Sequence, residues 1–128
     1  MQAMRFLSVA AAVLVSFCPN SFQAEELKQN IQRLLQMCKA EPGSVDAAWC
    51  AGYIAGISDQ MHLNGQVLHH LDIEPNRQLI AHMSICTEQS YAAKVQAFMT
   101  WAEKHSALWD QPYRLGVTTA LHEAWRCR

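Results

Sequence analysis

Four cysteines, Cys38, Cys50, Cys86 and Cys127, constrain the fold of this chain more than any other feature. An even number of cysteines in a short exported chain is typical of a disulfide framework, and four cysteines allow three connectivities. None of them forms the Cys-x-x-Cys pair that zinc sites use. We therefore predict two disulfide bonds, each of which stabilises a small domain by about 2–4 kcal/mol.

The first 24 residues have the pattern of a secretory signal peptide. Arg5 precedes an apolar run at positions 6–17, which is too short to span a bilayer stably. We expect cleavage after Ala24, which would also remove the fifth cysteine, Cys18, and leave residues 25–128 as a single domain. The alternative is a retained membrane anchor. Export would place the domain where disulfide bonds persist, with no membrane contact after cleavage.

Charge and motif spacing argue against several classes of function. The net charge is −1 with neutral histidines, and loss of Arg5 makes it one unit more negative. The basic face that phosphate binding requires is therefore missing, so we predict no nucleic-acid partner. His69 and His70 are adjacent, so their side chains diverge in any regular element, and a metal site would need residues from distant parts of the chain; we predict neither a metal nor a cofactor. No nucleophile elbow is present, and oxidised cysteines supply no thiolate, so we predict no enzyme.

Helical periodicity predicts an all-α fold, a small four-helix domain with two disulfides. We expect helices over residues 25–38, from Ser44 to about His62, from a cap at Thr87, and from Pro112 to the end of the chain. The Asn64-Gly65 turn signal should end the second helix, so we expect a loop-rich connection over residues 66–85. Strand-like alternation does not occur over any length.

The second predicted helix contains two glycines four residues apart, Gly52 and Gly56, with Tyr53 between them. Each glycine costs a helix about 1 kcal/mol relative to alanine. Together with Ala48, the two glycines form a face without bulky side chains. We therefore predict that these positions are helix-packing residues, against which another backbone lies.

The helix order favours one disulfide pairing. Cys38 ends the first helix and Cys50 lies in the first turns of the second, so a short turn makes them neighbours. Cys86 precedes the third helix and Cys127 follows the fourth, and an antiparallel hairpin would bring them together. We favour Cys38–Cys50 and Cys86–Cys127, while crossed pairings stay open.

Four pieces of sequence then point to a family: Leu34-Leu35-x-x-Cys38, Cys50-x-Gly52-Tyr53-Ile54-x-Gly56-Ile57-x-Asp59, Cys86 just before a helix, and Ala120-Leu121-x-x-Ala124-Trp125-x-Cys127. Together they resemble the Rap/Tai family of immunity proteins. The chain departs from that pattern at Arg126, where proline is usual, and at Thr87-Glu88, where a Cys-x-Pro is common. The resemblance covers nearly all of the chain after residue 24.

The resemblance implies a small helical periplasmic protein, often a homodimer. Its partner would be a peptidoglycan amidase effector delivered by type VI secretion, blocked by a rigid loop inserted into the amidase cleft. Our candidate loops are residues 64–76 and 105–111. The alternative is a periplasmic structural or chaperone-like helical protein with no toxin partner. The candidate partner-binding residues in the two loops are His69, Asp72, Glu74, Trp109 and Asp110.

Overall fold

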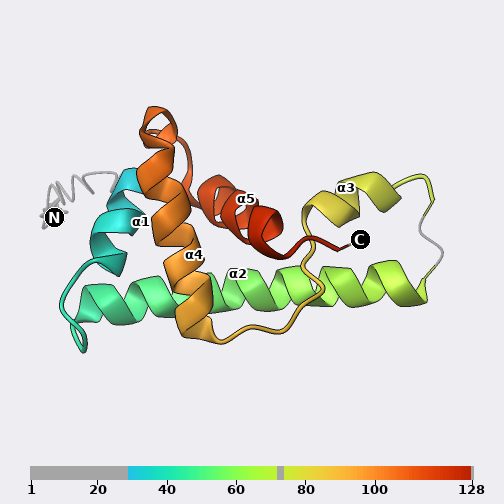
Figure 1. The fold of residues 1–128 in the computed structure, drawn as a ribbon, viewed down its shortest axis with the longest axis horizontal. Coiled ribbons are helices and arrows are strands. Elements are labelled where there is room, and N and C mark those ends of the chain that lie inside the picture. Colours follow the sequence, from blue (N-terminus) through green and yellow to red (C-terminus); the bar gives the residue numbers. More distant parts are fainter. Residues whose placement is uncertain (1–28, 72–73, 128) are drawn as a thin grey trace, which may run out of the picture.

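The computed structural model describes residues 29–71 and 74–127 of the 128-residue chain, and these residues form helices and connections without a strand. Four helices have seven or more residues, and two are shorter. The predicted all-α, four-helix class with two disulfides is confirmed. In chain order the elements are α1 (Ile31–Cys38), α2 (Val45–His70), α3 (Arg77–His82), α4 (Tyr91–Lys104), the 3-10 helix η1 (Ser106–Leu108) and α5 (Tyr113–Trp125) (Figure 1).

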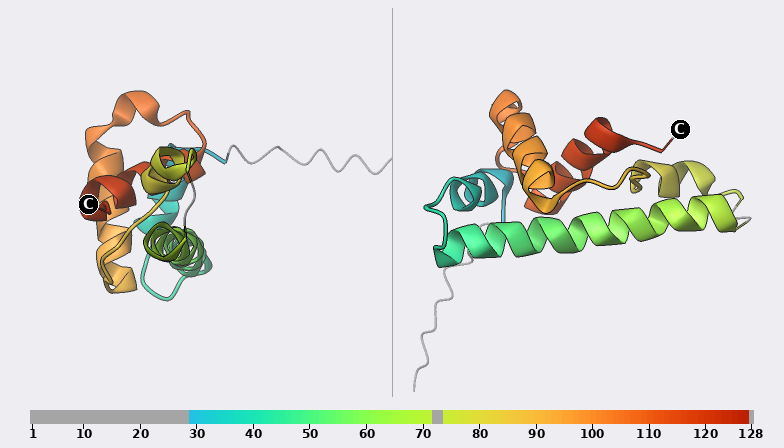
Figure 2. Two further views of the ribbon diagram at one scale, coloured as in Figure 1. Left: turned by 90° about the vertical axis from the view of Figure 1, so that its right-hand side faces the viewer. Right: turned by 60° about the horizontal axis from the view of Figure 1, so that its bottom comes forward.

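The long helix α2 runs the length of the molecule, and the other helices pack along it. Figure 2 shows α2 nearly end-on in its left panel, with α1, α3 and α5 on one side of it and α4 crossing beside it. The buried face of α2 is formed by Cys50, Ile54, Ser58, Met61, Gly65 and Leu68. It contacts a core to which α1, α4 and α5 contribute chiefly Ile31, Leu34, Phe98, Trp101, Ala102, Val117 and Leu121.

Short polar side chains determine where three of the helices begin. Asn30 Oδ1 accepts the Arg33 N–H at 2.9 Å, and Ser44 Oγ accepts the Ala47 N–H at 3.1 Å. The prediction of Thr87 as the cap of α4 is wrong, because Ser90 is its N-cap and accepts a hydrogen bond from the backbone N–H of residue 93. These side chains pair N–H groups that have no partner inside the helix.

The predicted end of α2 near His62 is also wrong, since the helix continues through Asn64-Gly65 to His70. Tertiary contacts stabilise this part of the helix. The Asn64 amide donates to the Met83 carbonyl at 2.8 Å, and a backbone hydrogen bond of 3.1 Å joins Ile85 to α2. Gly65 packs against residues 83–85. The Asn64-Gly65 pair therefore marks the place where these residues contact α2, not the end of the helix.

The predicted role of Gly52 and Gly56 as helix-packing residues is wrong within this chain. Both are exposed, and a Cβ atom added at either position would meet no atom within 4 Å. Close backbone approach occurs elsewhere. A Cβ at Gly65 would lie 2.5 Å from the Ile85 carbonyl oxygen, and a Cβ at Gly116 would lie 2.7 Å from Ile31 Cγ1.

Tyr53, the third predicted packing residue, does join α2 to α5. Its ring lies edge-on to the Tyr113 ring, with centroids 4.6 Å apart, and stacks on Trp49 at 5.2 Å. Burial raises the pKa of the Tyr53 hydroxyl, and the neighbouring Tyr113 adds to the effect. Aromatic contacts, rather than the glycine face, therefore hold this part of α2 against its neighbour.

The two disulfide bonds follow the pairing that the sequence favours. Cys38–Cys50 joins the end of α1 to the second turn of α2, with Cα atoms 5.2 Å apart. Cys86–Cys127 joins the segment before α4 to the residues after α5, with Cα atoms 4.9 Å apart. The crossed pairings do not occur.

Candidate partner-binding surface

Residues 105–111, which we call the η1 loop, connect α4 to α5 and are held by backbone hydrogen bonds. Three turn hydrogen bonds of 2.9–3.2 Å lie within the loop, with the N–H groups of residues 108, 109 and 111 as donors. Two more tie it to α1: the Ile31 N–H donates to the Gln111 carbonyl at 2.9 Å, and the Gln32 N–H donates to the Trp109 carbonyl at 3.2 Å. The backbone conformation of the loop is therefore set before any partner arrives.

The side chains of the η1 loop divide into an anchor and an exposed group. Trp109 is the anchor: its Nε1 donates to the Ala102 carbonyl at 2.8 Å, and its ring packs against the core. Leu108 is 38% exposed although it is a large apolar residue, and Asp110 is exposed beside it. Of the two predicted binding residues in this loop, Asp110 is the one that a partner can reach readily.

The other predicted binding residues lie at a different end of the molecule. His69 is in the last turn of α2, with Nε2 3.5 Å from Cys86 Sγ. Glu74 is exposed and accepts a hydrogen bond of 2.7 Å from Arg77 Nε, and Asp72 lies outside the described residues. The end of α2 is far from η1 in Figures 1 and 2, so the two predicted loops do not form one surface.

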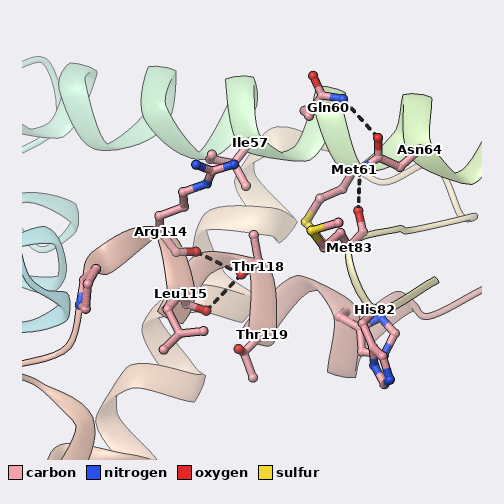
Figure 3. A pocket seen from close by; sticks show the side chains of 12 residues that line it. Ile57, Gln60, Met61, Asn64, His82, Met83, Arg114, Leu115, Thr118 and Thr119 are labelled. Atoms are coloured by element: carbon pink, nitrogen blue, oxygen red, sulfur yellow. Dashed lines mark hydrogen bonds between the residues drawn. The ribbon is translucent and has the colours of Figure 1, made fainter. Parts of the chain in front are cut away.

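A groove of about 560 Å³ separates α2 from α5 beside the end of α3. Figure 3 shows Arg114 and Thr118 of α5 opposite Ile57 and Met61 of α2. At one end of the groove the rings of His82 and His122 lie side by side, tilted by 57°, with centroids 5.4 Å apart. Two apolar side chains at the groove, Met83 and Leu115, are 39% and 51% exposed. The groove is thus a second surface that could receive apolar groups.

A polar pocket of about 400 Å³ lies where α2 meets the start of α4. The Tyr91 hydroxyl donates to the Asp59 carboxylate, with O···O distances of 3.2 and 3.4 Å, and this hydrogen bond raises the pKa of Tyr91. His62 Nε2 lies 3.3 Å from a Glu88 carboxylate oxygen. We call it the Lys94 pocket; it is lined by Asp59, His62, Leu63, Gln66, Glu88, Gln89, Ser90, Tyr91 and Lys94.

Sequence reasoning did not find the Lys94 pocket. Tyr91 is 51% exposed, and its hydroxyl meets Asp59 across the pocket. Asp59 is the last residue of the glycine-containing family motif. Its partner could not be identified, because the two residues are 32 positions apart in the chain.

Neither a metal centre nor a membrane span emerges from the residues that the structure describes. They contain no cluster of three or more His, Cys, Asp or Glu side chains that could hold a metal ion. Among the same residues, no helix combines the length and the apolar character needed to cross a membrane.

Comparison with known proteins gives one positive result. Residues 30–127 match the family model of Rap1a immunity proteins. No curated protein and no solved structure matches the chain. The matched residues extend from the cap of α1 to the last disulfide, so they include all the surfaces described above. The resemblance that the cysteine and glycine pattern indicates is confirmed, and the chain belongs to the family of Rap1a immunity proteins.

Proposed function

We propose that this protein is an exported, periplasmic inhibitor of a peptidoglycan amidase toxin and that it blocks the active site of that enzyme. Membership of the Rap1a family supports a protein that binds a toxin rather than one that catalyses a reaction. Two disulfide bonds support an oxidising compartment. In this proposal residues 1–24 are a cleaved signal peptide and residues 25–128 form the inhibitory domain. Family membership also favours this function over a structural or chaperone-like role without a toxin partner.

The observation that carries the occlusion mechanism is the set of hydrogen bonds that hold the η1 loop. Binding costs free energy when side chains and loops must be ordered, and a loop already held in place avoids most of that cost. The hydrogen bonds to α1 and the anchored Trp109 hold this loop. Leu108 and Asp110 then supply an apolar and an acidic group at its tip. Such a loop can fill an enzyme cleft without contributing any catalytic group.

The substitution Leu108→Glu tests this mechanism. We expect it to weaken inhibition of the cognate amidase by about 30-fold or more, since loss of a central apolar contact costs about 2 kcal/mol or more. The measurement is the inhibition constant for hydrolysis of purified peptidoglycan. Thermal unfolding should be almost unchanged, because Leu108 is partly exposed in the free protein.

The matched control is Val45→Glu, which changes an aliphatic residue that is 84% exposed at the start of α2, away from the η1 loop. It should inhibit as the wild-type protein does. If Leu108→Glu inhibited as well as Val45→Glu, the η1 loop would not be the occluding segment. If the wild-type protein failed to inhibit the amidase, the proposed function itself would be wrong.

We also propose that the protein forms a homodimer, as the resemblance to Rap/Tai proteins implies. The exposed Met83 and Leu115 at the groove supply apolar surface for a second copy. Light scattering of the purified protein should give twice the mass of one chain. Leu115→Glu should reduce this value to the mass of one chain. Val45→Glu should leave the dimer intact. A single-chain mass for the wild-type protein at micromolar concentration would contradict the proposal.

A further inference from the structure

The two disulfide bonds differ in how well their surroundings shield them. Cys50 is 1% exposed and belongs to the hydrophobic core, and Cys38 packs against that core. Cys86 and Cys127 are only half-buried, and Cys86 also borders a polar pocket of about 780 Å³. An attacking thiolate must reach a sulfur atom of the bridge. Cys86–Cys127 is therefore the bridge that an external thiol can reach first.

Cys86 Sγ lies against the last turns of α2. His69 Nε2 is 3.5 Å from this sulfur, and a Cβ atom added at Gly65, one turn earlier, would lie 3.3 Å from it. An imidazole that carries a proton on Nε2 can donate a hydrogen bond to the sulfur. Hydrogen bonds to an ionised acceptor are stronger than those to a neutral one, so this contact would stabilise a Cys86 thiolate more than the bridged sulfur.

The position of His69 determines which of the two sulfur atoms is the better leaving group. In thiol–disulfide exchange the attacked sulfur forms the new bond, and the other sulfur departs as a thiolate. The reaction is faster when the departing thiolate is the more stable one. The imidazole contacts Cys86 and so assists its departure, which requires attack on Cys127.

Two further charged side chains line the polar pocket beside the bridge. Arg126, which precedes Cys127 in the chain, attracts a thiolate, and Glu123 repels it. Both side chains are exposed, so solvent and salt screen their effects. The short contact with His69 is thus the interaction that should dominate the exchange.

We propose that the Cys86–Cys127 bridge is a site of thiol–disulfide exchange with small external thiols, and that His69 promotes the exchange by stabilising Cys86 as the leaving thiolate. The thiolate of the external thiol attacks Cys127 Sγ, and a mixed disulfide forms there. The bond between the two cysteine sulfurs breaks, and its electron pair goes to Cys86 Sγ, which takes a proton from His69 or from solvent. The external sulfur is oxidised as Cys86 is reduced, so no other oxidant or reductant takes part.

Backbone contacts would keep the two halves of the opened bridge near each other. The Cys86 N–H donates to the Trp125 carbonyl at 3.4 Å, and the Ile85 N–H donates to the Met61 carbonyl at 3.1 Å. These hydrogen bonds do not require the disulfide bond. The exchange therefore modifies the folded protein, and Cys86 stays close enough to displace the external thiol and restore the bridge.

The test incubates the purified protein with reduced glutathione, quenches the reaction by alkylation and maps the products by peptide mass spectrometry. We expect the first product to carry glutathione on Cys127 and an alkyl group on Cys86. It should form about 10-fold faster, or more, than the Cys38–Cys50 bridge opens. The reason is that Cys50 is 1% exposed, so local unfolding must precede attack on that bridge.

Substitutions at two adjacent histidines test the role of the imidazole. His69→Ala should slow formation of the mixed disulfide by about 5-fold or more, since a hydrogen bond to a charged group contributes about a factor of 10. His69→Gln, whose amide can donate from a similar position, should retain most of the wild-type rate. The matched control, His70→Ala, changes an exposed neighbour at the end of α2 and should leave the rate unchanged.

The direction of the effect separates this role from a structural one. If His69 only held the end of α2 in place, its loss would loosen the surroundings of the bridge, and His69→Ala would exchange faster. A rate for His69→Ala equal to or above the wild-type rate would therefore overturn the inference. Glutathione found first on Cys86, equal opening rates for the two bridges, or no mixed disulfide at all would also overturn it. None of these measurements uses the amidase, so their failure is distinct from failure of the proposed function.

Discussion

Replacing Gly65 with valine is expected to lower the free energy of unfolding by about 3 kcal/mol or more, at the upper end of the cost of overpacking a core. A Cβ atom at this position would lie 2.5 Å from the Ile85 carbonyl oxygen and 3.3 Å from Cys86 Sγ. The oxygen belongs to the backbone of a buried segment, which cannot rotate away as a side-chain tip can. Ile85 is fully buried, and Cys86 is held by its disulfide. The clash therefore forces α2 and residues 83–86 apart.

The measurement is chemical denaturation followed by circular dichroism, with Gly56→Ala as the matched control. Gly56 lies in the same helix with nothing within 4 Å of an added Cβ, so alanine should stabilise the protein by up to about 1 kcal/mol. The two substitutions are thus predicted to change the free energy of unfolding in opposite directions, although both lie in α2. Equal stability of Gly65→Val and the wild-type protein would show that the 83–86 segment does not pack on α2 as described.

Removal of the Cys86–Cys127 bridge by double substitution with alanine is expected to cost about 4 kcal/mol. The bridge closes a loop with a sequence separation of 41 residues, and the entropy gained by the unfolded chain grows with loop length. The Cys38–Cys50 bridge spans 12 residues, so the same model gives about 3 kcal/mol for its removal. For a domain of this size, a loss of about 4 kcal/mol lowers the midpoint of thermal unfolding by roughly 15 °C or more.

Calorimetry of the two double variants and of the wild-type protein, with and without reductant, tests this prediction. On addition of reductant, the wild-type protein should lose the stabilisation that both bridges provide. Each double variant should lose only the stabilisation provided by its one remaining bridge. Cys50 is 1% exposed, so the Cys50→Ala change also loses packing. This loss raises the cost of removing the Cys38–Cys50 bridge. The measured difference in stability between the two variants is therefore a lower bound on the difference that loop length alone produces. If reductant left wild-type stability unchanged, the bridges would not stabilise this fold.

Local sequence patterns were sufficient for the helical class, and they favoured the disulfide pairing that the structure shows. The Pro42-Gly43 turn brings Cys38 next to Cys50, and Gly43 adopts a positive φ of 85° that suits a tight turn. Ser44 begins α2 as predicted, because its hydroxyl caps the helix whatever packs around it. Local chemistry is enough at such positions, since every contact lies within a few residues in the chain.

Local patterns failed where a distant segment changes the preference of the chain. Asn64-Gly65 reads as a turn, yet contacts with residues 83–85 keep it helical. The same limit applies to the candidate site. Trp109 was predicted to bind the partner, but its Nε1 donates to the Ala102 carbonyl. No local signal places Tyr91 beside Asp59, so the Lys94 pocket could not be predicted.

The sequence by itself determined the helical class, the number of bridges and membership of the Rap1a family, because these depend on helical periodicity, on the cysteine count and on a linear motif, and it favoured the pairing that the structure then decided. Only the tertiary structure decided which side of α2 is buried and that Gly52 and Gly56 face outward. It also decided that the predicted loops lie apart and that Tyr91 meets Asp59. These properties depend on which distant side chains meet, and a helix with apolar residues on more than one face does not specify that on its own.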